Sequence, residues 1–230
     1  ISIDASTKLC LNKSQLSHDI IGNDAMMFND KRQLYKECAM STMITDRTYR
    51  IARENTQAMV IDVQERLTPH IYDHENIIKK TVTLIKGLQA LNVPIMLNEQ
   101  YKKGLGDTLP EIRDVLEGNN TKSFEKVTFS ACDNDEAWHH LAQQNRSVVL
   151  LFGVEVHVCV MQTALDLLDN GMQPVIIGDA VGSRYPYDKK QAIRRIRRAG
   201  GVISTVESIL FELCRSSQDP AFKTISNLIK

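Results

Sequence analysis

Three side chains with complementary chemistry follow or interrupt apolar runs in this sequence: a carboxylate, an ammonium and a thiol. Asp62 ends the run "AMVID", Lys126 lies in "FEKVTF", and Cys159 lies in "GVEVHVCVMQTALDLLDNG", just after "SVVLLF". A thiol attacks a carbonyl carbon as its thiolate, a carboxylate can remove the thiol proton, and an ammonium stabilises either anion. If the three residues converge in the fold, they can act as nucleophile, base and cation.

The position of Cys159 favours reactivity if a helix begins near Val158. The sulfur would then lie among unpaired backbone N–H groups at the positive end of the helix, which lowers a thiol pKa, and a nearby lysine would lower it further. The alternative is a buried structural cysteine, the more common fate of a single cysteine in an apolar stretch. The other cysteines default to structural roles, although Cys132 is close enough to Lys126 to line a pocket: Cys10, Cys38, Cys132 and Cys214.

Asp62 and Lys126 each have a structural alternative. A carboxylate after a buried strand must be paired or functional, because an unpartnered buried charge is costly, and Asp62 could equally bind the N–H groups of a loop. Lys126 could be solvated, with Glu125 as a surface partner. Further along, Asp179 with Ser183 and Arg184 is typical of a polar turn that holds a loop.

The elements that must position these residues alternate along the chain from about residue 57. Apolar runs predict strands near 58–62, 93–98, 124–129, 147–152, 174–179 and 201–206, most of them covered on both faces. Helical periods predict helices at 75–91, 135–144, 158–170, 188–199 and 206–214. This alternation predicts an α/β fold, a doubly wound, mostly parallel sheet of about six strands with helices on both faces. Ligands in such sheets bind beyond the carboxyl ends of the strands, where the three candidate residues would lie.

Composition narrows the class of partner. With 28 Lys and Arg against 28 Asp and Glu, the formal net charge is zero, which disfavours nucleic acid as the main partner. The basic segment "KKQAIRRIRR" (189–198) is either a local anion patch or, in better agreement with its apolar spacing, the solvated face of a helix. No apolar run approaches the length that spans a membrane, so no membrane partner is expected.

Cysteine usage and the N-terminal residues suggest a location and a domain boundary. The 5 cysteines are scattered without metal-ligand spacing, which indicates reduced thiols in a cytoplasmic protein rather than a disulfide framework or a zinc site. The first residues show no basic-then-apolar signal pattern. Residues 1–54 contain no convincing strand and are expected to form a partly helical or loosely ordered extension before the α/β domain at 55–230.

Taken together, Asp62, Lys126 and Cys159 resemble, in order and context, the Asp-Lys-Cys triad of the isochorismatase-like cysteine hydrolases. "AMVIDVQ" is similar to the first-strand motif of that family, "EKVTFSAC" to its lysine segment and "GVEVHVCVMQTALDLLDNG" to its nucleophile segment. The segment "VIIGDAVGSR" follows at the expected distance. The resemblance covers about residues 55–230 and implies the α/β/α sandwich of the family.

The resemblance also implies a mechanism. Asp62 would be the general base, Cys159 would attack an amide or ester carbonyl to form a thioester, and Lys126 would stabilise the thiolate and orient the carboxylate. The family further implies a cis peptide bond between Val154 and Glu155. That bond would direct the N–H groups of Glu155 and Cys159 at a developing oxyanion.

The segment after the second predicted strand decides between branches of the family. Nicotinamidase members carry an Asp and several His residues there to hold a metal, whereas "LNEQYKKGLGDTLPEI" has no histidine, so neither a metal nor another cofactor is expected. "EQYKKGLG" instead resembles the metal-independent branch, the isochorismatase domain-containing hydrolases. Candidates for the substrate pocket are Gln64, Glu99, Gln100, Tyr101 and Leu105. The same segment could equally be a surface loop set by its glycines.

The expected function is hydrolysis of a small amide- or ester-like substrate by a cytoplasmic homo-oligomer. Three alternatives stay open: a non-catalytic binding or scaffold protein that retains the pocket, isochorismate-type vinyl-ether hydrolysis, and a redox-sensing thiol. Loss of turnover in a Cys159→Ala variant is expected for the hydrolase, and selective alkylation of Cys159 well below pH 8 would favour an activated thiol over the scaffold protein.

Overall fold

The computed structural model describes residues 49–118 and 120–230. The chain divides after Tyr49, and Arg50–Lys230 form one compact unit. The greater part of the predicted N-terminal extension, residues 1–48, lies outside the described residues. None of the helices in the described ranges is long and apolar enough to cross a membrane.

A parallel sheet forms the centre of the compact unit. Its strands are β1 (Thr56–Ile61), β2 (Ile95–Gln100), β3 (Lys122–Lys126), β4 (Val148–Val154), β5 (Gln173–Gly182) and β6 (Val202–Ser204). The order across the sheet is β3-β2-β1-β4-β5-β6, and every neighbouring pair of these strands is parallel. The direction of winding reverses between β1 and β4, so the predicted doubly wound sheet is confirmed, and its switch point lies between these two strands.

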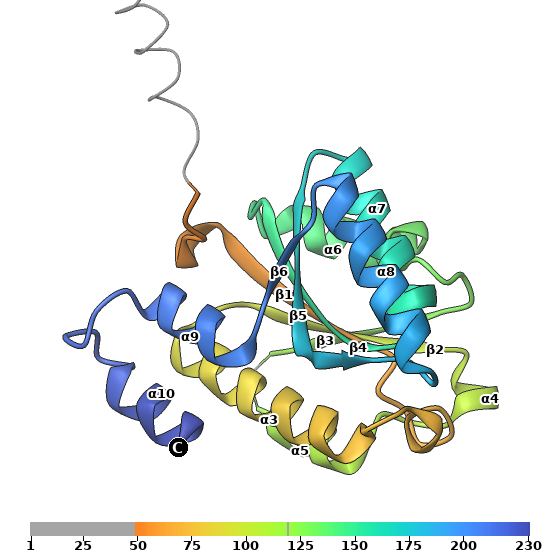
Figure 1. The fold of residues 1–230 in the computed structure, drawn as a ribbon, viewed down its shortest axis with the longest axis horizontal. Helices are drawn as coiled ribbons and strands as arrows, with labels where there is room; N and C mark the ends of the chain where they lie inside the picture. Colours follow the sequence, from red (N-terminus) through yellow and green to blue (C-terminus); the bar gives the residue numbers. More distant parts are fainter. Residues whose placement is uncertain (1–48, 119) are drawn as a thin grey trace, which may run out of the picture. The chain divides into compact units, whose positions relative to one another are not determined.

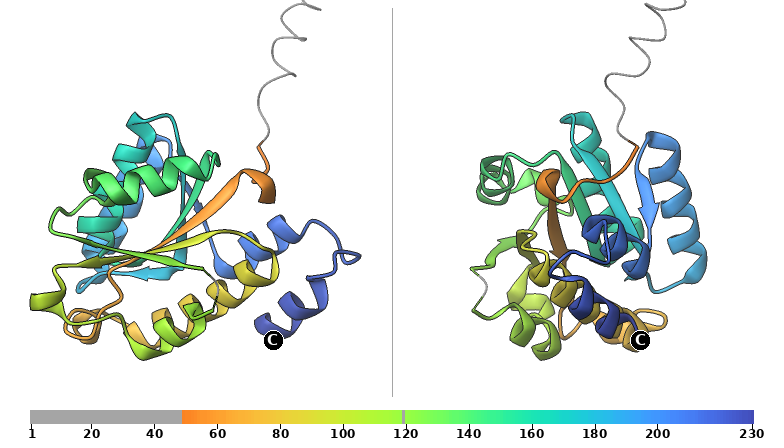
Figure 2. Two further views of the ribbon diagram at one scale, coloured as in Figure 1. Left: turned by 180° about the vertical axis from the view of Figure 1, so that it is seen from behind. Right: turned by 90° about the vertical axis from the view of Figure 1, so that its left-hand side faces the viewer.

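Helices cover both faces of the sheet (Figures 1 and 2). On one face lie α3 (His74–Ala90), α5 (Pro110–Leu116), α9 (Val206–Cys214) and α10 (Phe222–Ile229). On the other face lie α6 (Asp135–Gln143), α7 (Met161–Asp169) and α8 (Pro186–Ala199). All residues of β1 are buried, because both faces of this central strand are covered, and this explains the continuous apolar runs in the sequence.

Three short helices were not predicted from the sequence: α4 (Lys102–Leu105), α5 and α10. Each is shorter than the stretch of about 11 residues over which an apolar helical period is recognised, and α5 buries only Ile112 and Leu116. The helix predicted from residue 158 begins earlier, as a π-helical turn, η4 (Val156–Val160), which leads into α7. Strand β5 extends beyond its predicted end at Asp179, whose Oδ1 accepts a hydrogen bond from the N–H of Val206 and so holds the start of α9.

Gly153 allows the closest approach between β1 and β4. It pairs with Ile61 and has φ +115°, and a Cβ at this position would overlap the carbonyl oxygen of Ile61. Because Ile61 directly precedes Asp62, this approach joins the two segments that carry the carboxylate and the thiol. A side chain at position 153 would therefore both strain the backbone and separate the two strands.

Replacing Gly153 with alanine is expected to lower the free energy of unfolding by at least about 2 kcal/mol, because positive φ and overlap with the neighbouring strand add together. The matched control is Gly171→Ala, since Gly171 has φ +75° but no atom within 4 Å of the added Cβ. In the control, the free energy of unfolding should fall by only about 1 kcal/mol. Urea unfolding followed by circular dichroism measures both, and equal losses would contradict the role given to the close approach.

Candidate active site

The three candidate residues lie at or just after the carboxyl ends of β1, β3 and β4, of which β1 and β4 flank the switch point. Asp62 follows β1 with φ +53°, and Cys159 lies in η4, which follows β4. Lys126 is the last residue of β3, whereas the sequence had placed it inside a strand at 124–129. Its side chain reaches Asp62, and the distance between Lys126 Nζ and Asp62 Oδ2 is 2.8 Å.

The Asp62–Lys126 ion pair is completely enclosed, with both side chains inaccessible to solvent. The ammonium also donates to Gln100 Oε1 at 2.6 Å and to the carbonyl oxygen of Phe129 at 3.2 Å. These acceptors lie on different segments and fix Nζ in one position. Removing either partner would leave an uncompensated buried charge, so the two residues depend on each other.

The Cys159 thiol lies within electrostatic range of both members of the ion pair. Its residue is 5% exposed. Burial raises the pKa of Cys159 above its ordinary range and the charge of Asp62 raises it further, while Lys126 opposes both effects. The predicted lowering of this pKa is therefore wrong. The cysteine lies inside a covered turn and not at an open helix end, so desolvation outweighs the helix dipole, and the resting thiol is protonated.

The two oxygens of Asp62 have different surroundings. Oδ2 accepts the hydrogen bond from Lys126, whereas Oδ1 has no hydrogen bond of ordinary geometry to any described residue. Burial raises the pKa of Asp62, and the charge of Lys126 opposes that rise. The thiol of Cys159 also interacts with this carboxylate. Asp62 is thus a carboxylate of increased basicity with one oxygen available to accept a proton.

The corner between β4 and η4 is fixed by the side chain of Glu155, a residue that the sequence singled out only for its peptide bond and backbone N–H. The Val154–Glu155 peptide bond is cis, and the Glu155 carboxylate is buried. It accepts hydrogen bonds from the backbone N–H of Arg184 at 3.0 Å and from its Nε at 3.2 Å. Ser183 Oγ lies 3.0 Å from His157 Nδ1 in the same corner. The sequence offered one indication of this contact: residues 155 and 184 carry opposite charges, and each lies just beyond an apolar run.

Two of the five pocket candidates support the site from within the protein. Gln64 donates to the carbonyl oxygens of Gln100 and Gly106 and accepts from the N–H of Gln100, so its amide links β2 to the segment after α4. The Glu99 carboxylate is bound by its neighbours Thr108, Ser123 and Lys102. Burial alone would raise the pKa of Glu99, but these contacts together lower it. Its oxygens are engaged, and the segment does not fit a metal site.

Of the other three candidates, Gln100 contacts the ion pair, whereas Tyr101 and Leu105 lie nearer the surface. Gln100 Oε1 accepts from Lys126, and Gln100 Nε2 donates to the carbonyl oxygen of Val127, so this residue orients the ammonium. Tyr101 is exposed, and its backbone N–H donates to the carbonyl oxygen of Lys126. Leu105 is half-buried at the end of α4. Of the five, only Gln100 touches the ion pair directly.

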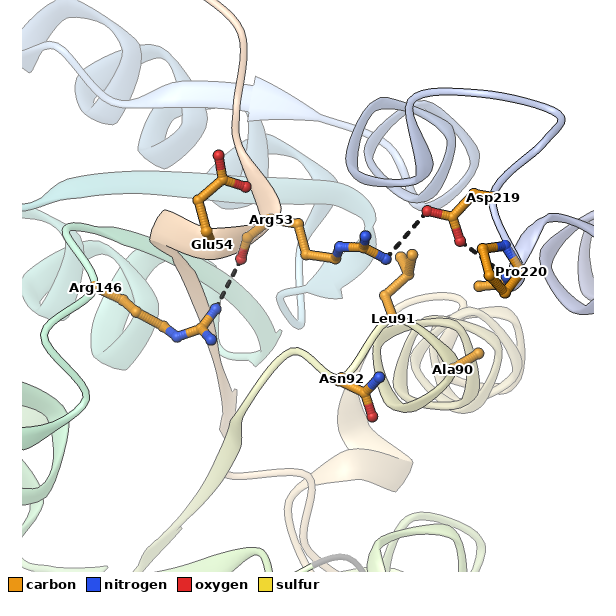
Figure 3. Close-up of a pocket in the computed structure, with 9 residues that line it drawn as sticks. Arg53, Glu54, Ala90, Leu91, Asn92, Arg146, Asp219 and Pro220 are labelled. Carbon is orange, nitrogen blue, oxygen red and sulfur yellow. Dashed lines mark hydrogen bonds and ion pairs between the residues drawn. The ribbon is translucent and has the colours of Figure 1, made fainter.

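A separate pocket of about 540 Å³ lies at the amino ends of β1 and β4 (Figure 3). Three of its charged side chains are engaged, since Arg53 pairs with Asp219 at 3.2 Å and Arg146 donates to the carbonyl oxygen of Arg53 at 2.7 Å. None of the candidate residues lines it. Within the described ranges, no group of three or more His, Cys, Asp or Glu residues is arranged to hold a metal ion.

The chain is similar to proteins of one family along most of its length. The model of the isochorismatase domain matches residues 56–208. Isochorismatase family protein 1B of Dictyostelium discoideum is 36% identical over 184 residues, which are 79% of this chain and 89% of that protein. The secreted isochorismatase effector Isc1 of Phytophthora sojae is 39% identical over 189 residues, which are 81% of this chain and 90% of that protein.

One solved structure is similar to this chain in both sequence and fold. The MAR1 ribonuclease of Caenorhabditis elegans is 36% identical, with a TM-score of 0.74 over 78% of this chain and 92% of that one. Sequence, domain model and fold agree over the part of the chain that carries the buried ion pair and the thiol. The chain belongs to the isochorismatase family and has its hydrolase fold.

Proposed function

We propose that this protein is a cysteine hydrolase that cleaves a small amide- or ester-like substrate through a thioester on Cys159. One observation carries the proposal. Lys126 holds one oxygen of Asp62, and the other oxygen has no hydrogen bond to the described residues, beside a thiol that burial keeps protonated. Such a thiol needs a base before it can attack, and Asp62 is in position to be that base.

Acylation begins with transfer of the thiol proton to Asp62 Oδ1 as the sulfur attacks the carbonyl carbon. The raised pKa of Asp62 makes its carboxylate a better proton acceptor. During this step the negative charge moves from the carboxylate to the sulfur and then to the carbonyl oxygen. Lys126, in range of both acid groups, stabilises that charge as it moves.

The tetrahedral intermediate then collapses to the thioester, and the leaving amine or alcohol takes the proton from Asp62. The backbone N–H groups of Glu155 and Cys159 are the proposed donors to the oxyanion. The contacts between Arg184 and the Glu155 carboxylate support this assignment, because they hold the backbone of that corner. A water molecule next attacks the thioester, Asp62 accepts its proton, and that proton returns to the sulfur.

The surroundings of the ion pair favour a small, partly apolar substrate. Val127 and Phe129 lie in the segment that directly follows Lys126. Their exposed fractions are 75% and 53%, so both can contact an apolar group of a substrate. Although the C. elegans protein is described as a ribonuclease, the cation of this cluster is already surrounded by acceptors. A phosphodiester would find little free positive charge there, so an uncharged carbonyl compound fits better.

Location and assembly stay predictions. The three cysteines in the described ranges, Cys132, Cys159 and Cys214, are free thiols, as a cytoplasmic location would require. One relative is described as secreted, so the relatives do not by themselves support a cytoplasmic location. A homo-oligomer remains the expected assembly, and mass measurement in solution would test it.

Replacing Cys159 with alanine is expected to lower turnover at least about 1000-fold, because the nucleophile is lost. The assay uses a panel of small amides and esters together with an RNA oligonucleotide, and circular dichroism checks the fold. Cys132→Ala is the matched control, since Cys132 Sγ contacts the carbonyl oxygen of Thr163 at 3.8 Å and burial raises its pKa to about 12. An unchanged rate in the Cys159 variant would rule out the mechanism.

The Asp62→Asn variant should separate thiol ionisation from catalysis. The charge of Asp62 raises the pKa of Cys159, so its removal leaves the charge of Lys126 unopposed and lowers that pKa. Alkylation of Cys159 by iodoacetamide at pH 7.5 should then become faster, about tenfold for each unit of decrease. Turnover should fall at least about 100-fold, because the base is lost.

Mass spectrometry of labelled protein between pH 6 and pH 10 measures the alkylation, and wild-type protein is the reference. In the wild type, labelling should increase continuously toward high pH, since the raised pKa keeps the thiol protonated near neutrality. Slower labelling of the Asp62→Asn variant would show that Asp62 assists ionisation of the resting thiol, contrary to the mechanism above.

A further inference from the structure

Asn98 is a completely buried polar residue in β2 without a hydrogen bond to its side chain. It is 0% exposed, and neither its Oδ1 nor its Nδ2 has a partner among the described residues. Buried amides are almost always hydrogen-bonded, to protein or to an ordered small molecule, because an unpaired one is costly. The side chain of Asn98 therefore needs a hydrogen-bonding partner that the described residues do not supply.

The Asn98 side chain lies on the same face of the sheet as the ion pair. Side chains two residues apart on a strand point to one face, so Asn98 shares its face with Gln100, which binds Lys126. Phe124, the register partner of Asn98 on β3, contacts the ring of His140 in α6 with a centroid distance of 5.4 Å. Helices α6 and α7 cover this face, and η4 leads directly into α7 (Figure 1).

Asn98 and Asp62 are also neighbours through the backbone. The N–H of Asp62 donates to the carbonyl oxygen of Asn98 at 3.0 Å. Each residue has buried side-chain atoms without a partner, Oδ1 in Asp62 and both amide atoms in Asn98. The two side chains therefore make no direct hydrogen bond to each other, although their backbones are in contact. A water molecule is the usual group that satisfies neighbouring buried polar atoms of this kind.

We propose that Asn98 and Asp62 together bind the water that hydrolyses the thioester. The inference rests on the proposed function and extends it to the second half of the reaction. Asp62 Oδ1 and Asn98 Oδ1 each accept one hydrogen of the water, which leaves a lone pair on its oxygen for the carbonyl carbon.

The atoms balance in this step. The water oxygen forms a bond to the carbonyl carbon, one of its protons passes to Asp62, and the carbon–sulfur bond breaks with its electron pair on sulfur. Asp62 then returns the proton to the thiolate, so that a carboxylic acid and free Cys159 result. Asn98 is a positioning residue in this scheme, because it acts through the water and takes no proton itself.

The role of Asn98 predicts a specific kinetic defect. A residue that positions only the hydrolytic water slows release of the acyl group and leaves its formation unchanged, so the acyl-enzyme accumulates. Both kcat and KM then fall. A residue needed only for folding would instead lower the amount of active enzyme, with no accumulated intermediate.

The test uses Asn98→Leu, which removes both hydrogen-bonding atoms at nearly constant volume, with p-nitrophenyl acetate as the probe. We expect a burst of nitrophenolate of about one equivalent per active site and an acetyl adduct on Cys159 by intact mass. The steady-state rate should be at least about tenfold lower than in the wild type. Added hydroxylamine should restore turnover, because it attacks the accumulated thioester without Asn98.

The matched control is Thr81→Val, since the hydroxyl of Thr81 is equally buried and unpartnered but lies in α3, on the opposite face. Its kinetics should equal those of the wild type. The inference is overturned if Asn98→Leu shows no burst and no adduct, or if its steady-state rate is unchanged. Turnover that survives Cys159→Ala would instead remove the thioester itself, and with it the proposed function.

Discussion

The buried ion pair between Asp62 and Lys126 is the interaction on which the rest of the site depends. Two opposite charges 2.8 Å apart, both inaccessible to solvent, are tolerable only with further hydrogen bonds to the ammonium. The contact with Gln100 supplies one of these, and Gln64 in turn holds the backbone of Gln100. The strand order β3-β2-β1 thus brings residues from three neighbouring strands to a common pair of charges.

Burial and this pair together set the state of the Cys159 thiol, the proposed nucleophile. Burial raises the pKa of the thiol, and the Asp62 carboxylate raises it further, where a lone lysine would lower it. The resting site contains one cation, one anion and a neutral thiol, a balance that costs less in a buried place than two anions would. In the proposed mechanism, proton transfer from sulfur to Asp62 keeps the same charge balance, so the thiolate forms without adding a second anion to the buried site.

Much of the architecture was predictable, because long apolar runs such as 147–152 and helical periods such as 75–91 are local signals. The three site residues could be selected from their positions after such runs and from the family motifs. The direction of the Cys159 pKa could not be predicted, since it depends on how deeply η4 is covered in the fold. The structural role of Gln64 was also hidden, because its partners are 36 and 42 residues away along the chain. Short helices such as α4 could not be predicted either, because a single turn shows no repeated apolar spacing.

The neutral side chain at position 98 follows from the same charge balance. A carboxylate there would place a second anion close to Asp62, which would raise the Asp62 pKa further and compete for the single charge of Lys126. An apolar residue would fit the strand but could hold no water beside Asp62 Oδ1. An amide offers a hydrogen-bond acceptor without a charge, so it can orient a water molecule while Asp62 remains the base. The amide that β2 carries at position 98 is therefore compatible with both the ion pair and the proposed water site.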